Sequence, residues 1–149
     1  TPEEEEEVAD LWKPPRSTDP PVSVVDNQPV SRYDIFSLQG LNWVNDEVIN
    51  CYLKVLLRAA SAGELEGAPA KPLHAHVFQT FFWTKLATKG YNYAAVRRWS
   101  KKFDIFAMDA VIVPINQSNT HWVLGVINVR DKRFEFFDSM GHPGGGAST

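Results

Sequence analysis

Cysteine is nearly absent from this sequence, in which Cys51 is the single example among 149 residues. One cysteine excludes a disulfide framework and suits a reducing, intracellular compartment. No apolar run reaches the roughly 18 residues that a membrane-spanning helix requires, and the acidic start is not typical of a secretory signal. The net charge of −3 gives no overall electrostatic reason to expect a nucleic-acid partner. The sequence therefore predicts a protein that binds neither membranes nor nucleic acid.

The length and composition fit one globular domain between two ends of biased composition. Hydrophobic residues make up 44% of the chain, which is enough to form a core. Residues 1–21 combine a block of five glutamates with two proline pairs, a composition typical of a mobile or surface-hugging arm. We therefore expect the domain over residues 22–141 and a glycine-rich tail over residues 142–149.

Two capping patterns predict helices in the first half of the domain. After a weak strand at 22–25, Ser31 with Asp34 three residues later is typical of a short capped helix that Gly40 can end. Asn45, followed by two acidic residues, predicts the start of a long helix. Apolar residues then recur at helical spacing to about residue 60, so one face of this helix should pack in the core.

Cys51 lies in this predicted helix, about two turns from its start. No cation or histidine adjoins it in the sequence to favour the thiolate, and free cysteine is usually a small buried hydrophobe. Cys51 is therefore interpreted as a packing residue.

The middle of the chain predicts a loop and then two helices. Residues 61–72 are rich in Ala, Gly and Pro, which indicates a variable loop. An aromatic-rich helix is expected over 78–89, ended by Gly90, and a shorter helix over 93–99. The first of these helices should contribute its aromatic side chains to the core.

Two polar groups in this region have an ordinary and a functional interpretation. His74 and His76 lack the further ligands that a metal site needs, so exposed or capping roles are favoured. A basic cluster around Trp99 forms either a solvated face or a docking surface for an acidic partner or phosphates. Its members are Arg97, Arg98, Lys101 and Lys102.

The last third of the chain predicts a sheet. Residues 110–115 form a nearly continuous apolar run, which is typical of a buried strand. Two further strands, at 122–129 and 134–137, flank a charged break at 130–133 and indicate a hairpin. Helices followed by strands predict an α+β fold with helices packed on a mostly antiparallel sheet.

His121 opens this hairpin and Asp138 closes it. If the turn is centred between Arg130 and Asp131, residues whose numbers sum to 261 lie opposite, and Asp138 becomes the diagonal neighbour of His121, within about 7–8 Å. A slip of one residue in this register places the two on opposite faces. An imidazole with a carboxylate behind it is two thirds of a nucleophile-activating triad. The ordinary alternative is a strand-end histidine beside an Asp-Ser-Met-Gly turn.

Six motifs occur in order along the chain. They are LNWVNDEVIN at 41–50, FQTFFWTKL at 78–86, VRRWSKK at 96–102, VPI at 113–115, HW at 121–122 and FDSMG at 137–141. This series resembles the SENP/Ulp family, the cysteine proteases that process and remove the ubiquitin-like modifier SUMO. The resemblance covers about residues 22–141 and implies a papain-like α+β protease fold. It also implies SUMO and SUMO-conjugated proteins as partners of a monomeric enzyme in the nucleus or at the nuclear envelope.

One part of the family pattern is absent. In the family an oxyanion-hole Gln and an Asp-Cys-Gly nucleophile follow the aspartate motif, and this sequence contains no Asp-Cys-Gly. The chain thus resembles a truncated protease domain that carries the base, His121, and its orienting acid, Asp138, without the nucleophile. These 149 residues alone are expected to be inactive. In a complete enzyme a cysteine thiolate would attack the carbonyl after the Gly-Gly of the modifier, and water would hydrolyse the thioester, with no metal or organic cofactor.

The resemblance assigns substrate contacts to four residues. Trp43 and Trp122 match family positions that form a narrow aromatic channel over the Gly-Gly tail, so bulkier tails are rejected. Asp46 matches a position that contacts a basic residue of the modifier, and a SUMO-like partner could use Arg98. Each has an ordinary alternative: core filling for the tryptophans, a first-turn helix acid for Asp46 and a solvated cation for Arg98.

Two other functions stay open. A truncated form that keeps the tryptophans could hold SUMO without cutting it, and a related cysteine protease could act on another ubiquitin-like protein or a viral polyprotein. An Asp-Cys-Gly segment in the parent chain would exclude the first alternative. Cleavage assays with several modifiers would test the second.

Overall fold

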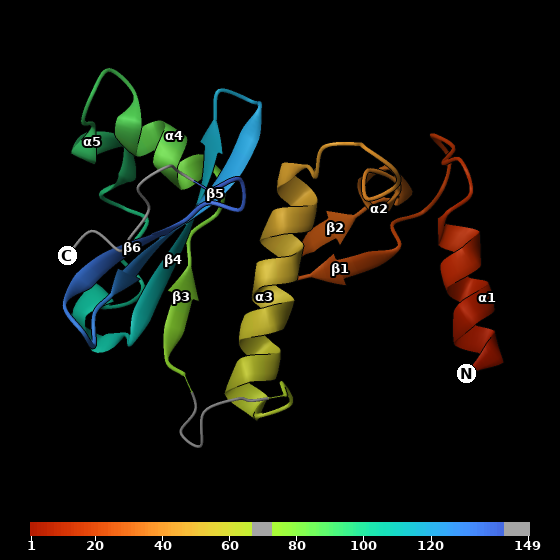
Figure 1. Ribbon diagram of the computed structural model, residues 1–149, viewed down its shortest axis with the longest axis horizontal. Helices are drawn as coiled ribbons and strands as arrows, with labels where there is room; N and C mark the ends of the chain where they lie inside the picture. The colour runs from red at the N-terminus through yellow and green to blue at the C-terminus, as the bar shows by residue number, and fades with distance from the viewer. Residues whose placement is uncertain (67–72, 142–149) are drawn as a thin grey trace. The chain divides into compact units, whose positions relative to one another are not determined.

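The computed structural model describes residues 1–66 and 73–141 (Figure 1). The expected tail at 142–149 and the second half of the loop predicted at 61–72 lie outside the described residues. The chain divides into two compact units, Thr1–Val55 and Leu56–Thr149. No helix in the described ranges is long and apolar enough to cross a membrane.

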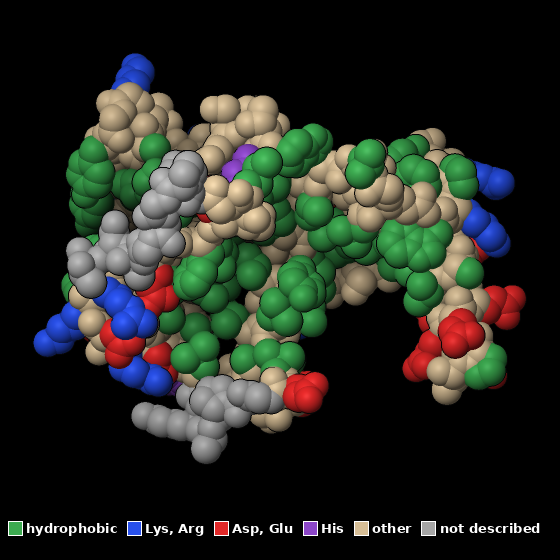
Figure 2. Space-filling model, in the orientation of Figure 1, with side chains coloured by type: hydrophobic (Ala, Val, Ile, Leu, Met, Phe, Trp, Pro, Cys, Tyr) green, Lys and Arg blue, Asp and Glu red, His purple; other side chains and the backbone are tan. Residues whose placement is uncertain are grey.

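The first unit begins with helix α1 (Pro2–Leu11), which is not expected from the sequence. Thr1 and Glu4 form a capping box at its start, and the glutamates lie in the first turns, where negative charge is favourable (Figure 2). At its end, Arg32 donates hydrogen bonds to the Asp10 carboxylate (2.8 Å) and to the Asp10 carbonyl. The hydrogen bond from Arg32, with help from Lys13, lowers the pKa of Asp10 to about 2. Mobility of this arm stays a prediction.

A short hairpin follows, formed by β1 (Ser23–Val25) and β2 (Gln28–Val30). The first strand confirms the sequence prediction. The turn residues Asp26 and Asn27 both have positive φ, 51° and 63°, the conformation of a tight two-residue hairpin turn.

Both predicted caps are confirmed. Ser31 and Asp34 form the capping box of α2 (Arg32–Phe36), which ends before Gly40. The side chain of Asn45 accepts a hydrogen bond from the Val48 N–H (3.0 Å) at the start of α3 (Asp46–Ala62). This helix ends two residues beyond the predicted limit.

The second unit is built on a four-stranded sheet in the order β3-β4-β5-β6 (Figure 1). Its strands are β3 (Ala75–Val77), β4 (Ala110–Gln117), β5 (His121–Asn128) and β6 (Arg133–Phe137). The β3 and β4 strands run parallel, and the other neighbours are antiparallel, which confirms a mostly antiparallel sheet. Leu124 pairs with Phe137 and Val126 with Glu135, so the predicted hairpin register is confirmed.

The core of this unit covers one face of the sheet. Its buried members are Phe78, Val111, Val113, Ile115 and Val123. The strand residues among them are odd-numbered, so they project from the same face. Aromatic side chains from α4 (Phe81–Ala87) and from the turns after α5 (Tyr93–Val96) pack against them, as do Ile105 of the 3-10 helix η1 (Ile105–Ala107) and the adjacent Met108.

Helices α4 and α5 are both shorter than the sequence prediction, and α4 ends at Ala87 instead of residue 89. Phe78 does not begin α4 but continues the direction of β3, where its N–H donates to the Ile112 carbonyl (2.9 Å) and its side chain is 3% exposed. The second helix ends at Val96 instead of residue 99. The sequence pattern could not distinguish the buried end of a strand at Phe78 from the first turn of a helix, because aromatic side chains face the core in both cases.

Candidate active site

His121 and Asp138 lie in contact at one end of the β5–β6 hairpin. His121 Nε2 and Asp138 Oδ1 are 2.6 Å apart. Leu124 pairs with Phe137, so the next residues outward, Val123 and Asp138, lie opposite each other. His121 lies two residues before Val123 on the same face of β5, which makes it the diagonal neighbour of Asp138. The two side chains are 15% and 9% exposed, so water screens their interaction only weakly.

The Asp138 carboxylate is held from a second side by its own turn. Oδ1 also accepts a hydrogen bond from the Met140 N–H (2.9 Å), and the Gly141 N–H donates to the Asp138 carbonyl (3.2 Å). Gly141 adopts φ +67°, which glycine tolerates without strain. The Asp-Ser-Met-Gly turn thereby fixes the carboxylate that faces the imidazole.

This contact determines which imidazole nitrogen can meet a nucleophile. With Nε2 directed at the carboxylate, Nδ1 is the nitrogen that can accept a proton from a thiol or hydroxyl. The carboxylate orients the ring and stabilises the imidazolium that forms. The pair therefore has the parts of a general base with its orienting acid.

Strand alternation sends the neighbouring Trp122 to the other face of the sheet from His121. Trp122 pairs with Asn116 of β4 and is half-buried. Arg98 is exposed on the turn after α5, and no hydrogen bond or ion pair joins it to the histidine or to Asp138 within residues 1–66 and 73–141. The structure thus brings His121 and Asp138 together and leaves Arg98 outside this contact.

Trp43 and Asp46 belong to the first unit. Trp43 is 63% exposed on the segment before α3, and Asp46 is the first residue of that helix. The segment is anchored at its end by Asn45, whose Nδ2 donates to Asp34 Oδ1 (2.7 Å) while Oδ1 caps the helix. An exposed tryptophan on an anchored segment does not fill a core, which disfavours the ordinary interpretation of Trp43.

The Asp34 carboxylate accepts hydrogen bonds from both Ser31 and Asn45, and the sequence predicted only its pairing with Ser31. Its other oxygen accepts from the Ser31 N–H and from the Ser31 hydroxyl, both at 2.7 Å. Burial alone would raise the pKa of Asp34, but the hydrogen bonds from Ser31 and Asn45 outweigh it and lower the pKa. The capping pattern identified Ser31 and Asp34, whereas the bond to Asn45 joins two helices and has no local signal.

The remaining candidates show no site chemistry. Cys51 is half-buried in α3 and unbridged. In the described part of the chain, no three His, Cys, Asp or Glu side chains lie close enough to hold a metal ion. His76, expected to be exposed or capping, is instead stacked on Phe103, with ring centres 3.8 Å apart.

The match to a family model decides the classification. Residues 42–146 match the model described as the Ulp1 protease family, C-terminal catalytic domain. The chain belongs to the Ulp1 protease family. Its relatives include sentrin-specific protease 2 of Homo sapiens, 41% identical over 115 residues, and ubiquitin-like-specific protease 1A of Arabidopsis thaliana, 46% identical over 104 residues. The matched regions span 77% and 66% of this chain.

Solved structures of the Ulp1 family have the same fold. The C-terminal Ulp1 protease domain in complex with Smt3, the yeast ortholog of SUMO, matches 98% of this chain with a TM-score of 0.73 and 25% identity. This likeness confirms the papain-like α+β fold. The alignment covers 59% of that protease domain and 18% and 20% of the two relatives, so the chain corresponds to a part of each of them.

Proposed function

We propose that this chain is part of the catalytic domain of a SUMO-specific cysteine protease, which cleaves after the Gly-Gly of the modifier. The observation that carries the proposal is the 2.6 Å contact between His121 and Asp138 in the predicted register. Family membership and relatives named as sentrin-specific or ubiquitin-like-specific proteases support it. The enzyme would act both on SUMO precursors and on SUMO-conjugated proteins.

In the proposed mechanism His121 is the base and then the acid. Nδ1 takes the proton of a cysteine thiol, and the thiolate attacks the carbonyl carbon of the terminal glycine. The tetrahedral intermediate collapses to a thioester when the imidazolium gives its proton to the leaving lysine amine or peptide nitrogen. Water, activated by the same imidazole, then hydrolyses the thioester and releases the free glycine carboxylate. Asp138 stabilises the imidazolium throughout.

The nucleophile is proposed to lie outside these 149 residues. The single cysteine in the sequence, Cys51, lies within α3. Its sequence neighbours, Asn50 and Tyr52, supply neither a cation nor a base to favour the thiolate. A thiol supplied by another segment of the catalytic domain would complete the triad.

Four further residues are proposed to hold the modifier. Trp43 and Trp122 would form the walls of a channel that only a Gly-Gly tail can traverse, because any side chain would collide with an indole ring. Asp46 would pair with a basic residue on the modifier, and Arg98 with an acidic one. The exposure of Trp43 supports its part in this proposal. The proposed compartment is intracellular, with residence in the nucleus or at the nuclear envelope.

The test measures hydrolysis of a SUMO C-terminal reporter by the full-length protein that contains this segment. His121→Ala should reduce kcat by about 10³-fold to 10⁴-fold with little change in SUMO affinity, because it removes the base and not the binding surface. Asp138→Asn should also lower kcat. His74→Ala, at an exposed histidine beside β3, is the matched control and should retain full activity. Unchanged turnover in His121→Ala would reject the mechanism.

A second arm of the test uses the 149-residue chain alone. It should bind SUMO without releasing the reporter group. Release that is abolished by Cys51→Ala would contradict the proposed position of the nucleophile. Equal cleavage of reporters built on other ubiquitin-like modifiers would reject SUMO specificity while leaving the proteolytic mechanism intact.

A further inference from the structure

Positive charge is concentrated in one stretch of this acidic protein. Residues 73–103 contain six Lys or Arg residues and no Asp or Glu. Since the whole chain has a net charge of −3 and this stretch contributes +6, the remaining residues together carry −9. Four of the six cations form what we name the α5 basic patch, which consists of Arg97, Arg98, Lys101 and Lys102.

The α5 basic patch faces solvent without local compensation. All four side chains are exposed, and none forms an ion pair with a carboxylate of the described ranges. Three arginines elsewhere are paired: Arg32 with Asp10, Arg130 with Asp109, and Arg133 with Glu135. At the β5–β6 turn, accordingly, acidic and basic side chains are mixed on the surface (Figure 2). The unpaired cations after α5 repel one another and leave a local positive field.

The backbone beneath the patch is fixed by the core. Val96 is 5% exposed, and Trp99 packs against the rings of Phe78 and Phe82 at centre distances of 6.3 Å and 5.5 Å. Successive turns link the segment, with the Trp99 N–H donating to the Val96 carbonyl at 2.8 Å. Val96, which is buried, and Trp99, which is partly buried, therefore hold the basic residues on a formed surface, and this lowers the entropic cost of binding a partner there.

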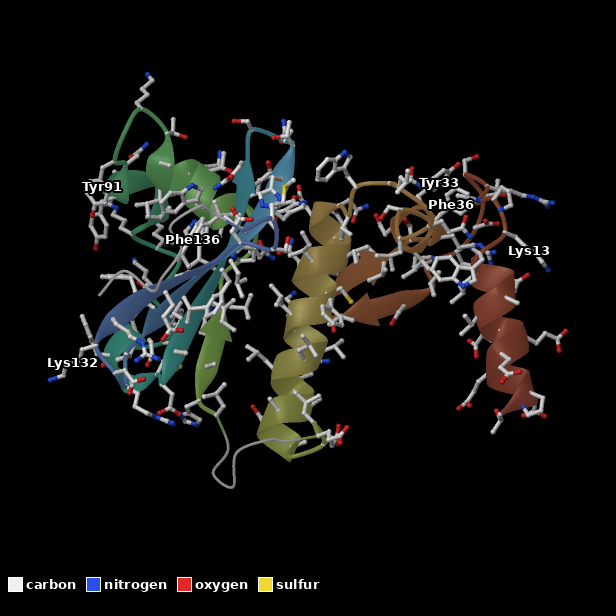
Figure 3. The ribbon with its side chains drawn as sticks, in the orientation of Figure 1. Lys13, Tyr33, Phe36, Tyr91, Lys132 and Phe136 are labelled. Carbon is white, nitrogen blue, oxygen red and sulfur yellow. The ribbon has the colours of Figure 1, made fainter. Side chains whose placement is uncertain are left out.

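Exposed phenol groups adjoin the cations. Tyr93 precedes Arg97 by one helical turn and is 59% exposed, and the Arg97 N–H donates to the Tyr93 carbonyl (2.9 Å). Tyr91 is 76% exposed beside α5 (Figure 3). Guanidinium and phenol groups both donate hydrogen bonds to carboxylates, and arginine does so with two parallel N–H groups.

We propose that the α5 basic patch is a docking surface for an acidic peptide segment, rich in Asp and Glu, of a partner protein. Charge complementarity carries this choice, because four exposed, unpaired cations match a short run of carboxylates. A nucleic acid is the less favoured occupant. A nucleic-acid backbone would extend beyond a patch of this length and meet the rest of the protein. The residues outside 73–103 have a net charge of −9, which opposes the binding of a long polyanion.

The test measures the fluorescence anisotropy of a labelled peptide of about ten residues, alternating Glu and Gly, with the 149-residue chain at about 50 mM salt. A peptide with Gln in place of Glu and a single-stranded oligonucleotide of similar length are the competing probes. The patch variant is Arg97→Glu/Lys101→Glu/Lys102→Glu, which leaves Arg98 unchanged because of its proposed role toward the modifier. The control variant, Lys13→Glu/Arg16→Glu/Lys132→Glu, has the same change of net charge at other exposed cations, of which Lys13 and Lys132 are labelled in Figure 3.

The acidic peptide should bind the wild-type chain and the control variant, and the patch variant should weaken binding at least about tenfold. Binding should fall as salt rises, and the Gln peptide should not bind. Equal loss in both variants, absence of binding to the wild-type chain, or tighter binding of the oligonucleotide would overturn the proposal. Circular dichroism of each variant verifies the fold. Since no SUMO is present, the outcome is independent of the proposed protease function.

Discussion

Substitution of Asn45 should show how the segment that presents Trp43 is held. The Asn45 side chain makes two hydrogen bonds: it accepts from the Val48 N–H at 3.0 Å and donates to Asp34 Oδ1 at 2.7 Å. Loss of a helix cap costs about 1 kcal/mol, and loss of a hydrogen bond to a charged group costs about 1.5 kcal/mol at least. Asn45→Ala should therefore lower the free energy of unfolding by about 2.5 kcal/mol.

Two further variants separate the two bonds. Asn45→Ser keeps a capping oxygen but no longer reaches Asp34, so it should lose only about 1.5 kcal/mol. In an Asp34→Ala background, Asn45→Ala should cost only about 1 kcal/mol, because the second bond is already absent. Urea unfolding followed by circular dichroism provides these values, since α3 contributes strongly to the helical signal. Equal stability of Asn45→Ala and wild type, or no difference between the Ser and Ala variants, would refute this account of the segment.

Three other predictions concern the modifier, pH and the core. Trp43→Ala should weaken SUMO affinity and lower turnover together, and a binding titration that gives the wild-type affinity would remove Trp43 from the proposed channel. Burial lowers the pKa of His76, so the contribution of the neutral ring to folding stability should be fully present above the ordinary pKa near 6.5 and should be lost as the pH falls through the lowered pKa. His76→Phe keeps a ring against Phe103 and should abolish this loss, as measured by melting curves at about pH 7.5 and about pH 5.5. Val111→Ala removes two methyl groups from a fully buried side chain and should cost about 2 kcal/mol in urea unfolding, whereas Val24→Ala, at a strand residue that is 62% exposed, should cost much less.

Local signals were sufficient to predict much of the fold. The Ser31 and Asn45 caps, the antiparallel hairpin and its register follow from hydrogen-bond chemistry within a few residues, and all are confirmed. The hairpin register was decisive for the candidate site, because a slip of one residue would have sent His121 and Asp138 to opposite faces. The charged break at 130–133 was enough to centre the turn and so to predict that His121 and Asp138 are neighbours.

Features that depend on tertiary contacts were less predictable. Phe78 has the apolar character of a helix position, yet its backbone bonds to β4 and continues a strand direction. The bond from Asn45 to Asp34 joins residues eleven positions apart and has no sequence signature. Helix α1 is stabilised by a capping box and by Arg32, whereas the glutamates and the proline pairs indicated a mobile or surface-hugging arm. At Phe78, a contact from another element outweighed the local preference.

The central claim is that His121 and Asp138 serve a cysteine nucleophile in SUMO cleavage. The most direct test incubates the full-length protein containing this segment with a SUMO probe whose C-terminus carries a thiol-reactive group, and then measures the intact mass. One covalent adduct on a cysteine other than Cys51, formed much more slowly in His121→Ala, is the predicted result. Reversible binding without an adduct, or an adduct that forms equally fast without His121, would contradict the claim.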